Sequence, residues 1–226
     1  MFVPATFAAA LLMTIISTIC WGSFANTFKL TRNYRFELYY WDYAFGIFLI
    51  SLLLAFTMGS HSGGETAFLA NVHSAAASNL WYAAIGGFIF NIANVLLLAG
   101  IEIAGLAVAF PISIGIALVE GVALSYALQP KGSAALLAAG VAFAVLAIIL
   151  IGKAYGAMQG AGRSVSRKGV VVCIVSGLLM GVFAPFVTRS MTAARPLTPY
   201  TVAVFFTLAA LACCFVFNTI LMKRPP

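Results

Sequence analysis

"AGLAVAFPISIGIALVEGVALSYAL", residues 104–128, carries a single charged side chain, that of Glu120. A helix needs about 20 consecutive apolar residues to cross the hydrocarbon core of a bilayer. Uninterrupted apolar runs of about 18 residues or more are typical of transmembrane helices. The stretch therefore predicts a transmembrane helix that carries one carboxyl group inside the membrane.

Six further apolar runs of similar length accompany it. They cover residues 4–28, 38–58, 79–101, 133–152, 169–189 and 198–222. Hydrophobic residues make up 63% of the 226 residues and charged residues only 8%, against roughly 25% charged in soluble domains. The sequence therefore predicts an all-α, polytopic helical membrane protein with seven transmembrane helices and no soluble domain.

The basic residues predict how the chain is oriented, because Lys and Arg concentrate in cytoplasmic loops. Most of the 12 Lys and Arg residues fall on one side of the predicted spans: Lys29, Arg32, Arg35, Lys153, Arg163, Arg167, Lys168, Lys223 and Arg224. We therefore expect the N-terminus outside and the C-terminus inside, in a bacterial inner (plasma) membrane. This distribution also accounts for the net charge of +7, which then gives no support to nucleic-acid binding.

A short internal match predicts a repeated unit. Residues 19–25, "ICWGSFA", align with residues 178–184, "LLMGVFA", with identical Gly, Phe and Ala at three positions. The first and sixth spans are then equivalent, and a unit of five spans places consecutive units in opposite orientations. We expect a first five-helix repeat at 1–152, a cytosolic linker at 153–168, and the first two helices of a second, inverted repeat at 169–226. The chain is accordingly expected to be C-terminally truncated.

Three stretches resemble the drug/metabolite transporter superfamily, in the branch of the ureide permeases and the glucose/rhamnose-type sugar porters. They are "CWGSFANTFKL" (20–30), "RFELYYWDYAFG" (35–46) and "AVAFPISIGIALVEG" (107–121). The resemblance implies ten helices in two five-helix halves, a central substrate site, and a cytosolic loop between the fifth and sixth helices. Residues 156–169, "GAMQGAGRSVSRKG", lack the GxxxxGK[ST] pattern of a phosphate-binding loop, so ATP binding is not expected.

Polar side chains inside the predicted spans are the candidates for a transport site, because an unpaired polar group cannot face lipid cheaply. An ionised acid at mid-helix costs about 2.5–3.5 kcal/mol, so Glu120 is expected to bind substrate and a coupling proton. Ser113 shares its helical stripe, and Asn91 and Asn94 place two amides on one face of the preceding span. We expect these residues to line one polar cavity. A neutral, hydrogen-bonded structural acid is the alternative for Glu120.

The first two spans supply the other candidates. Trp21, in the Trp-Gly element of the first quoted stretch, and Asn26 are expected to contact substrate. Asp42 is expected to form a cytosolic gate by pairing with Lys29 or Arg32. The structural alternatives are a hydrogen bond across a helix contact for Asn26, helix capping for Asp42, and anchoring at the membrane surface for Lys29.

Together these features predict a secondary active transporter, a permease that moves a small polar metabolite such as a ureide, nucleobase or sugar. Symport with protons is expected, and sodium is the other candidate coupling ion. No enzymatic activity, cofactor, metal or nucleic acid is expected. The expected partners are the substrate and the lipid bilayer, with a homodimer as an open alternative. Two other interpretations stay open: an exporter of the same superfamily, and a non-transporting seven-helix membrane protein or inactive fragment.

Overall fold

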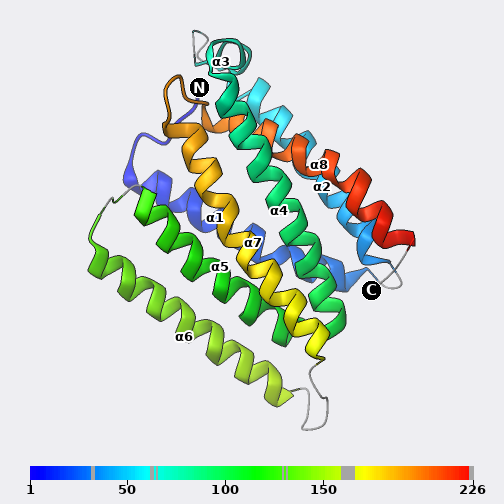
Figure 1. Cartoon of the computed structure of the whole chain (residues 1–226). Helices are drawn as coiled ribbons and strands as arrows, with labels where there is room; N and C mark the ends of the chain where they lie inside the picture. Colours follow the sequence, from blue (N-terminus) through cyan, green and yellow to red (C-terminus); the bar gives the residue numbers. More distant parts are fainter. Residues whose placement is uncertain are drawn as a thin grey trace.

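The computed structural model describes residues 1–31, 34–61, 64, 66–128, 130, 132–158 and 166–223, and these form eight α-helices (Figure 1). The helices are α1 (Phe7–Leu30), α2 (Phe36–Phe56), α3 (Phe68–Ser74), α4 (Ala77–Ala104), α5 (Leu106–Leu128), α6 (Ala134–Met158), α7 (Arg167–Thr192) and α8 (Pro199–Lys223). All but α3 are long and apolar enough to cross a membrane. The predicted polytopic helical membrane protein with seven spans is therefore confirmed.

The helices differ most from the predicted spans in an additional short helix and in the segment around residues 153–168. The short helix α3 has no counterpart among the predicted spans, since its seven residues are too few to cross a bilayer. Helix α6 continues to Met158 and α7 begins at Arg167, so both extend into the segment expected to be a linker, 153–168. The equivalence of 1–152 and 169–226 as repeats stays a prediction.

Successive spans run in opposite directions, which defines two sides of the molecule. One side, the α3 side, carries α3 and the α5–α6 and α7–α8 connections (Figure 1). The other, the C-terminal side, carries the α1–α2 and α4–α5 connections and the end of α8. On the α3 side, the Asn79 amide donates to the carbonyl oxygens of Ala194 and Arg195 at 3.0 and 2.9 Å. These bonds fix the start of α4 to the α7–α8 connection.

Helix α7 is central because it packs between α4 and α5, while α8 packs between α4 and α2 (Figure 1). Small residues permit these approaches. A Cβ atom added at Gly177 would lie 2.7 Å from the carbonyl oxygen of Ser113, and one added at Gly87 would overlap the carbonyl oxygen of Phe206. Helices in lipid gain little from hydrophobic burial, so close backbone packing of this kind supplies much of their attraction.

Helix α1 is one of the two least enclosed spans, together with α6, and it crosses the others obliquely (Figure 1). It is fixed near its C-terminal end, where the Tyr39 hydroxyl donates to the Phe24 carbonyl oxygen at 2.7 Å and the rings of Phe24 and Tyr43 lie 5.4 Å apart. The exposed hydroxyls of Thr14 and Thr18 donate to carbonyl oxygens one turn back in the same helix, at 2.9 and 2.8 Å. That internal bonding lets them face lipid without an unpaired donor.

Candidate substrate cavity

A cavity of about 600 Å³ lies between α5 and α7 and is bordered by α1, α4 and α6. We call it the central cavity. Its lining residues on α5 run from Ile114 to Tyr126 and those on α7 from Met180 to Thr188, so most of them lie in the later parts of both helices. Because both helices end on the α3 side, the cavity lies in the half of the bundle nearer that side.

Aromatic rings form much of the cavity wall. Trp21, Phe90, Tyr126 and Phe183 line it, on four different helices. Phe90 and Phe183 pack edge to face with ring centroids 5.3 Å apart, and Phe206 stacks behind them at 5.1 and 5.7 Å. Ring pairs at such distances favour tilted packing and hold one another in place. The wall therefore presents ordered ring faces to whatever enters.

Hydroxyl groups supply the polar part of the wall, and a backbone carbonyl without its helical donor lies next to it. Ser125, Tyr126 and Thr188 lie near the ends of α5 and α7 and line the cavity. Pro185 lies inside α7 and has no N–H, so it leaves the carbonyl of Gly181 without its helical donor. That carbonyl oxygen would lie 3.7 Å from a Cβ added at the cavity residue Gly121. A bound solute can thus meet the hydroxyls of the wall.

Glu120 lies beside this cavity without lining it. Its side chain packs against α7, where a Cβ added at Gly181 would lie 2.8 Å from Oε2 and 2.9 Å from Cγ. The Oε2 atom is buried and has no hydrogen-bond partner among the described residues. The residue lines a second space of about 850 Å³ between α5, α6 and α7, which we call the lateral cavity. Glu120 is the sole charged residue of that lining and sits at the α5–α7 contact that separates the two cavities.

The two asparagines of α4 lie elsewhere. Asn91 and Asn94 are fully buried on the face of α4 that meets α2 and α8. Asn91 accepts a hydrogen bond from the Cys214 thiol at 3.2 Å. Asn94 lies beside the hydroxyls of Tyr40 and Tyr43, but neither of its polar atoms has a hydrogen bond of proper geometry within the described part of the chain.

The expected single polar cavity lined by Glu120, Asn91 and Asn94 is therefore wrong. The reason is the position of α7, which packs between α4 and α5 and keeps their polar residues apart. Ser113 is also turned away from both cavities, because its buried hydroxyl donates to the Cys173 carbonyl oxygen at 2.8 Å. Of the residues expected to contact substrate, Trp21 is the one that lines the central cavity.

The remaining candidates are at the C-terminal side. The side chain of Asn26 is exposed. The side chain of Lys29 and the whole of Arg32 lie outside the described residues, so their pairing with Asp42 stays a prediction. Asp42 is exposed and accepts a hydrogen bond from the Tyr34 hydroxyl at 2.5 Å, which raises the pKa of that phenol.

The acid that the sequence reasoning missed is Glu37. It is 2% exposed and pairs with the guanidinium of Arg35 at 2.9 Å, and this hydrogen bond raises the pKa of Arg35. The buried face of α2 consists of Phe36, Glu37, Tyr40, Ala44, Ser51 and Ala55. Helical spacing places Glu37 on this face and Asp42 off it. Small and aromatic residues recur along α2 at helical spacing, on the same face as Glu37. This pattern in the sequence could have distinguished the two acids.

Together these observations describe an integral membrane protein with an aromatic cavity between its spans and an acid packed beside that cavity. Its polar residues form more than one group, since those of α4 face away from the cavity. Comparisons with protein-family models, with characterised proteins and with solved structures found no match for this chain.

Proposed function

We propose that the protein is a secondary active transporter that binds a small metabolite in the central cavity. The observation that carries the proposal is a space of about 600 Å³ between membrane-spanning helices. Binding sites for small molecules commonly measure about 300–1,000 Å³ and combine apolar walls with a few polar groups. The similarity of residues 20–30, 35–46 and 107–121 to drug/metabolite transporters supports the same function.

The lining favours a neutral solute that has a ring and a polar edge. No charged side chain is among the described residues that line the central cavity, so an ionic solute would leave its charge unpaired there. Trp21, Phe90 and Phe183 offer ring faces, and Ser125 and Thr188 offer hydroxyls. Nucleobases, cyclic ureides and sugars all combine a flat or apolar face with polar substituents, and they are the proposed substrate class.

Glu120 is the proposed coupling residue. Protonation would neutralise a carboxylate that has an unpaired buried oxygen, and ionisation would require water or a donor to reach it. The side chain packs on Gly181, which lies opposite the cavity residue Gly121, so a change at Glu120 acts on the α5–α7 contact directly. Proton binding and solute binding can therefore influence each other without a shared ligand.

An exporter of amphipathic compounds is the second candidate, because the aromatic and aliphatic walls also suit larger apolar solutes. The two candidates differ in selectivity and direction. We would reconstitute the purified protein, load vesicles with one member of a solute panel, and measure exchange of the labelled solute. The panel would hold nucleobases, allantoin-like ureides, sugars and planar organic cations. Saturable exchange confined to one ring class supports the metabolite permease, whereas broad exchange of amphipathic cations supports the exporter.

Filling the central cavity should abolish that exchange. Ala184 lines the cavity, so Ala184→Phe puts a ring into the space that the solute would occupy. We expect at least about a tenfold loss of affinity, which corresponds to about 1.4 kcal/mol. Ala142→Phe, on the exposed face of α6, is the matched control and should leave exchange unchanged. Normal exchange by a well-folded Ala184→Phe variant would remove the central cavity from the proposed mechanism.

A further inference from the structure

Unpaired buried polar atoms gather between α2, α4 and α8. In the described part of the chain they are the Tyr40 hydroxyl, Nδ2 of Asn91, both polar atoms of Asn94, and Oδ1 of Asn218. All four side chains are at most 1% exposed. We call this group the polar seam. Nearly all buried polar groups in proteins have hydrogen-bond partners, so a concentration of unpaired ones calls for a physical explanation.

The seam begins beside the central cavity. Asn91 directly follows Phe90, a cavity residue, on α4. A row of aromatic rings also connects the central cavity to the seam. The ring centroids lie 6.1 Å apart from Trp21 to Phe24, 5.4 Å from Phe24 to Tyr43, and 5.6 Å from Tyr43 to Tyr40. A displacement at the cavity wall therefore has a continuous packed route to the seam.

From there the seam runs toward the C-terminal side. Asn91 and Asn94 lie in the later half of α4, Tyr40 in the second turn of α2, and Asn218 near the end of α8. All three of these helix parts approach the C-terminal side, whereas the central cavity lies toward the α3 side. The cavity and the seam thus occupy opposite halves of the membrane span.

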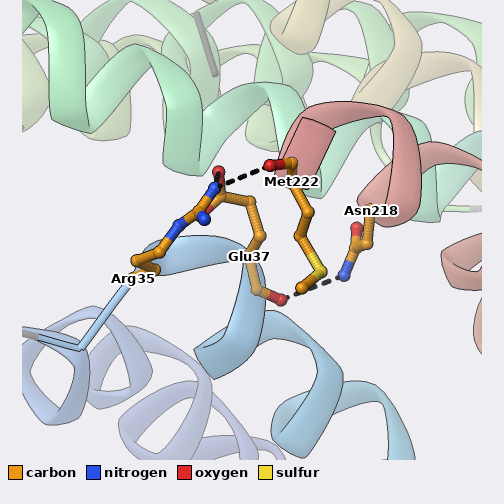
Figure 2. Close-up of polar contacts among 4 residues, drawn as sticks. All are labelled: Arg35, Glu37, Asn218 and Met222. Carbon is orange, nitrogen blue, oxygen red and sulfur yellow. Dashed lines mark hydrogen bonds and ion pairs between the residues drawn. The ribbon is translucent and has the colours of Figure 1, made fainter. Parts of the chain in front are cut away.

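Polar contacts between the start of α2 and the end of α8 lie at that side of the seam, as Figure 2 shows. Arg35 donates to the Glu37 carboxylate at 2.9 Å and to the Met222 carbonyl oxygen at 3.2 Å. The Asn218 amide donates to the Glu37 carbonyl oxygen at 3.2 Å. The bonds from Arg35 to Met222 and from Asn218 to Glu37 connect the start of α2 to the last turns of α8, and the Glu37 carboxylate holds Arg35 in place for the first of them. A cation there also suits the partial negative charge of a helix C-terminus. We call the two bonds that join the helices the latch.

We propose that the polar seam is the closed half of a water-filled pathway and that the latch holds it shut. The inference rests on the proposed transport function, since it supplies the exit opposite the central cavity. When α2 and α8 separate, water or a polar solute reaches the unpaired amides and the Tyr40 hydroxyl, and these gain the partners that they lack. Opening the latch is then favoured by hydration of the seam and opposed by loss of the hydrogen bonds from Arg35 to Met222 and from Asn218 to Glu37.

Native cysteines allow a direct test. Cys213 and Cys214 are 4% and 0% exposed, and Cys214 donates to Asn91 within the seam. Cys173 is equally buried but lies on α7 against Ser113, away from the seam. A cationic, membrane-impermeant methanethiosulfonate reagent is applied to each side of oriented vesicles that contain the full chain. Peptide mass spectrometry then gives the modification rate of each cysteine.

We expect Arg35→Gln to raise the modification rates of Cys213 and Cys214 at least about tenfold from the C-terminal side, with Cys173 unchanged. Arg35→Lys should give an intermediate rate because it keeps the charge but loses the fork of donors. Arg189→Gln, on the α3 side, is the matched control and should leave all rates unchanged. A rate for Cys214 in Arg35→Gln equal to that of the unaltered protein would overturn the proposal. So would a parallel rise at Cys173, which indicates general loosening of the fold.

A second variant tests the hydration of the seam separately. Asn94→Leu removes two unpaired polar atoms, so it should slow the modification of Cys214 in the Arg35→Gln background and leave the fold intact in thermal unfolding. Faster or unchanged modification of Cys214 would contradict hydration of the polar seam. These measurements need no transported solute. A seam that opens in a protein without solute exchange would therefore refute the transport function alone, and a sealed seam in an active transporter would refute the pathway alone.

Discussion

Glu120→Met should make the protein more stable and at the same time abolish proton-driven accumulation of its solute. The unpaired Oε2 atom is buried against Gly181, and leaving a buried polar atom unsatisfied costs about 1–3 kcal/mol. Methionine is unbranched and of similar length, so it removes that cost without a new clash. Thermal unfolding in detergent and accumulation under an imposed pH gradient measure the two effects. Opposite changes in stability and activity are typical of functional residues.

Glu120→Gln removes the ionisable proton of the side chain and keeps its size and shape. Exchange of solute without a gradient should persist in this variant, whereas accumulation driven by a proton gradient should be lost. Glu102→Gln is the control, because Glu102 is exposed at the end of α4 and should not affect either measurement. Proton-driven accumulation by Glu120→Gln at the unaltered rate would rule out Glu120 as the coupling residue.

Gly87→Ala should prevent normal assembly of the bundle. A Cβ at this position would overlap the carbonyl oxygen of Phe206 and lie 2.8 Å from its carbonyl carbon. Both atoms belong to the backbone of α8, so no change of side-chain rotamer relieves the clash and α4 and α8 must move apart. Overpacking commonly costs about 1–3 kcal/mol and occasionally more; we expect the upper end of that range. The fraction that elutes as a single species in size-exclusion chromatography and the melting temperature are the measurements.

Gly22→Ala and Gly46→Ala are the matched controls. Neither glycine has any described atom within 4 Å of an added Cβ. Alanine favours a helix over glycine by about 1 kcal/mol, so both variants should keep or slightly increase the stability. Equal loss of assembly in Gly22→Ala and Gly87→Ala would show that the α4–α8 contact has no special importance.

The transmembrane spans could be predicted because length and hydropathy alone determine them. The predicted span 104–128 corresponds to α5, Leu106–Leu128, and the predicted span 79–101 to α4, Ala77–Ala104. Helix α3 could not be predicted in the same way, since seven residues between polar segments carry no comparable apolar signal.

The neighbours of each helix were harder to predict. Spans that are apolar on every face give no indication of which face meets protein, and chain order suggested that α4 and α5 lie together. The insertion of α7 between them depends on close approaches at Gly177 and Gly181, which only the three-dimensional packing identifies. Trp21 lines the central cavity, whereas the expected shared cavity does not include Asn91 and Asn94, which are buried on another face of α4. The sequence immediately around Glu37 carries no motif comparable to the Trp-Asp-Tyr element around Asp42.

The loose attachment of α1 makes the protein sensitive to its lipids. Its apolar stretch, Phe7–Phe24, has 18 residues and spans about 27 Å at 1.5 Å per residue, close to the roughly 30 Å of a bilayer core. A helix longer than the local thickness tilts to keep its apolar length covered. Trp21 lies on this helix and faces the central cavity, so thinner membranes should incline α1 further and shift the indole against the solute. We expect solute affinity to vary with acyl-chain length in reconstituted vesicles, while unfolding of the α4–α7–α8 core does not.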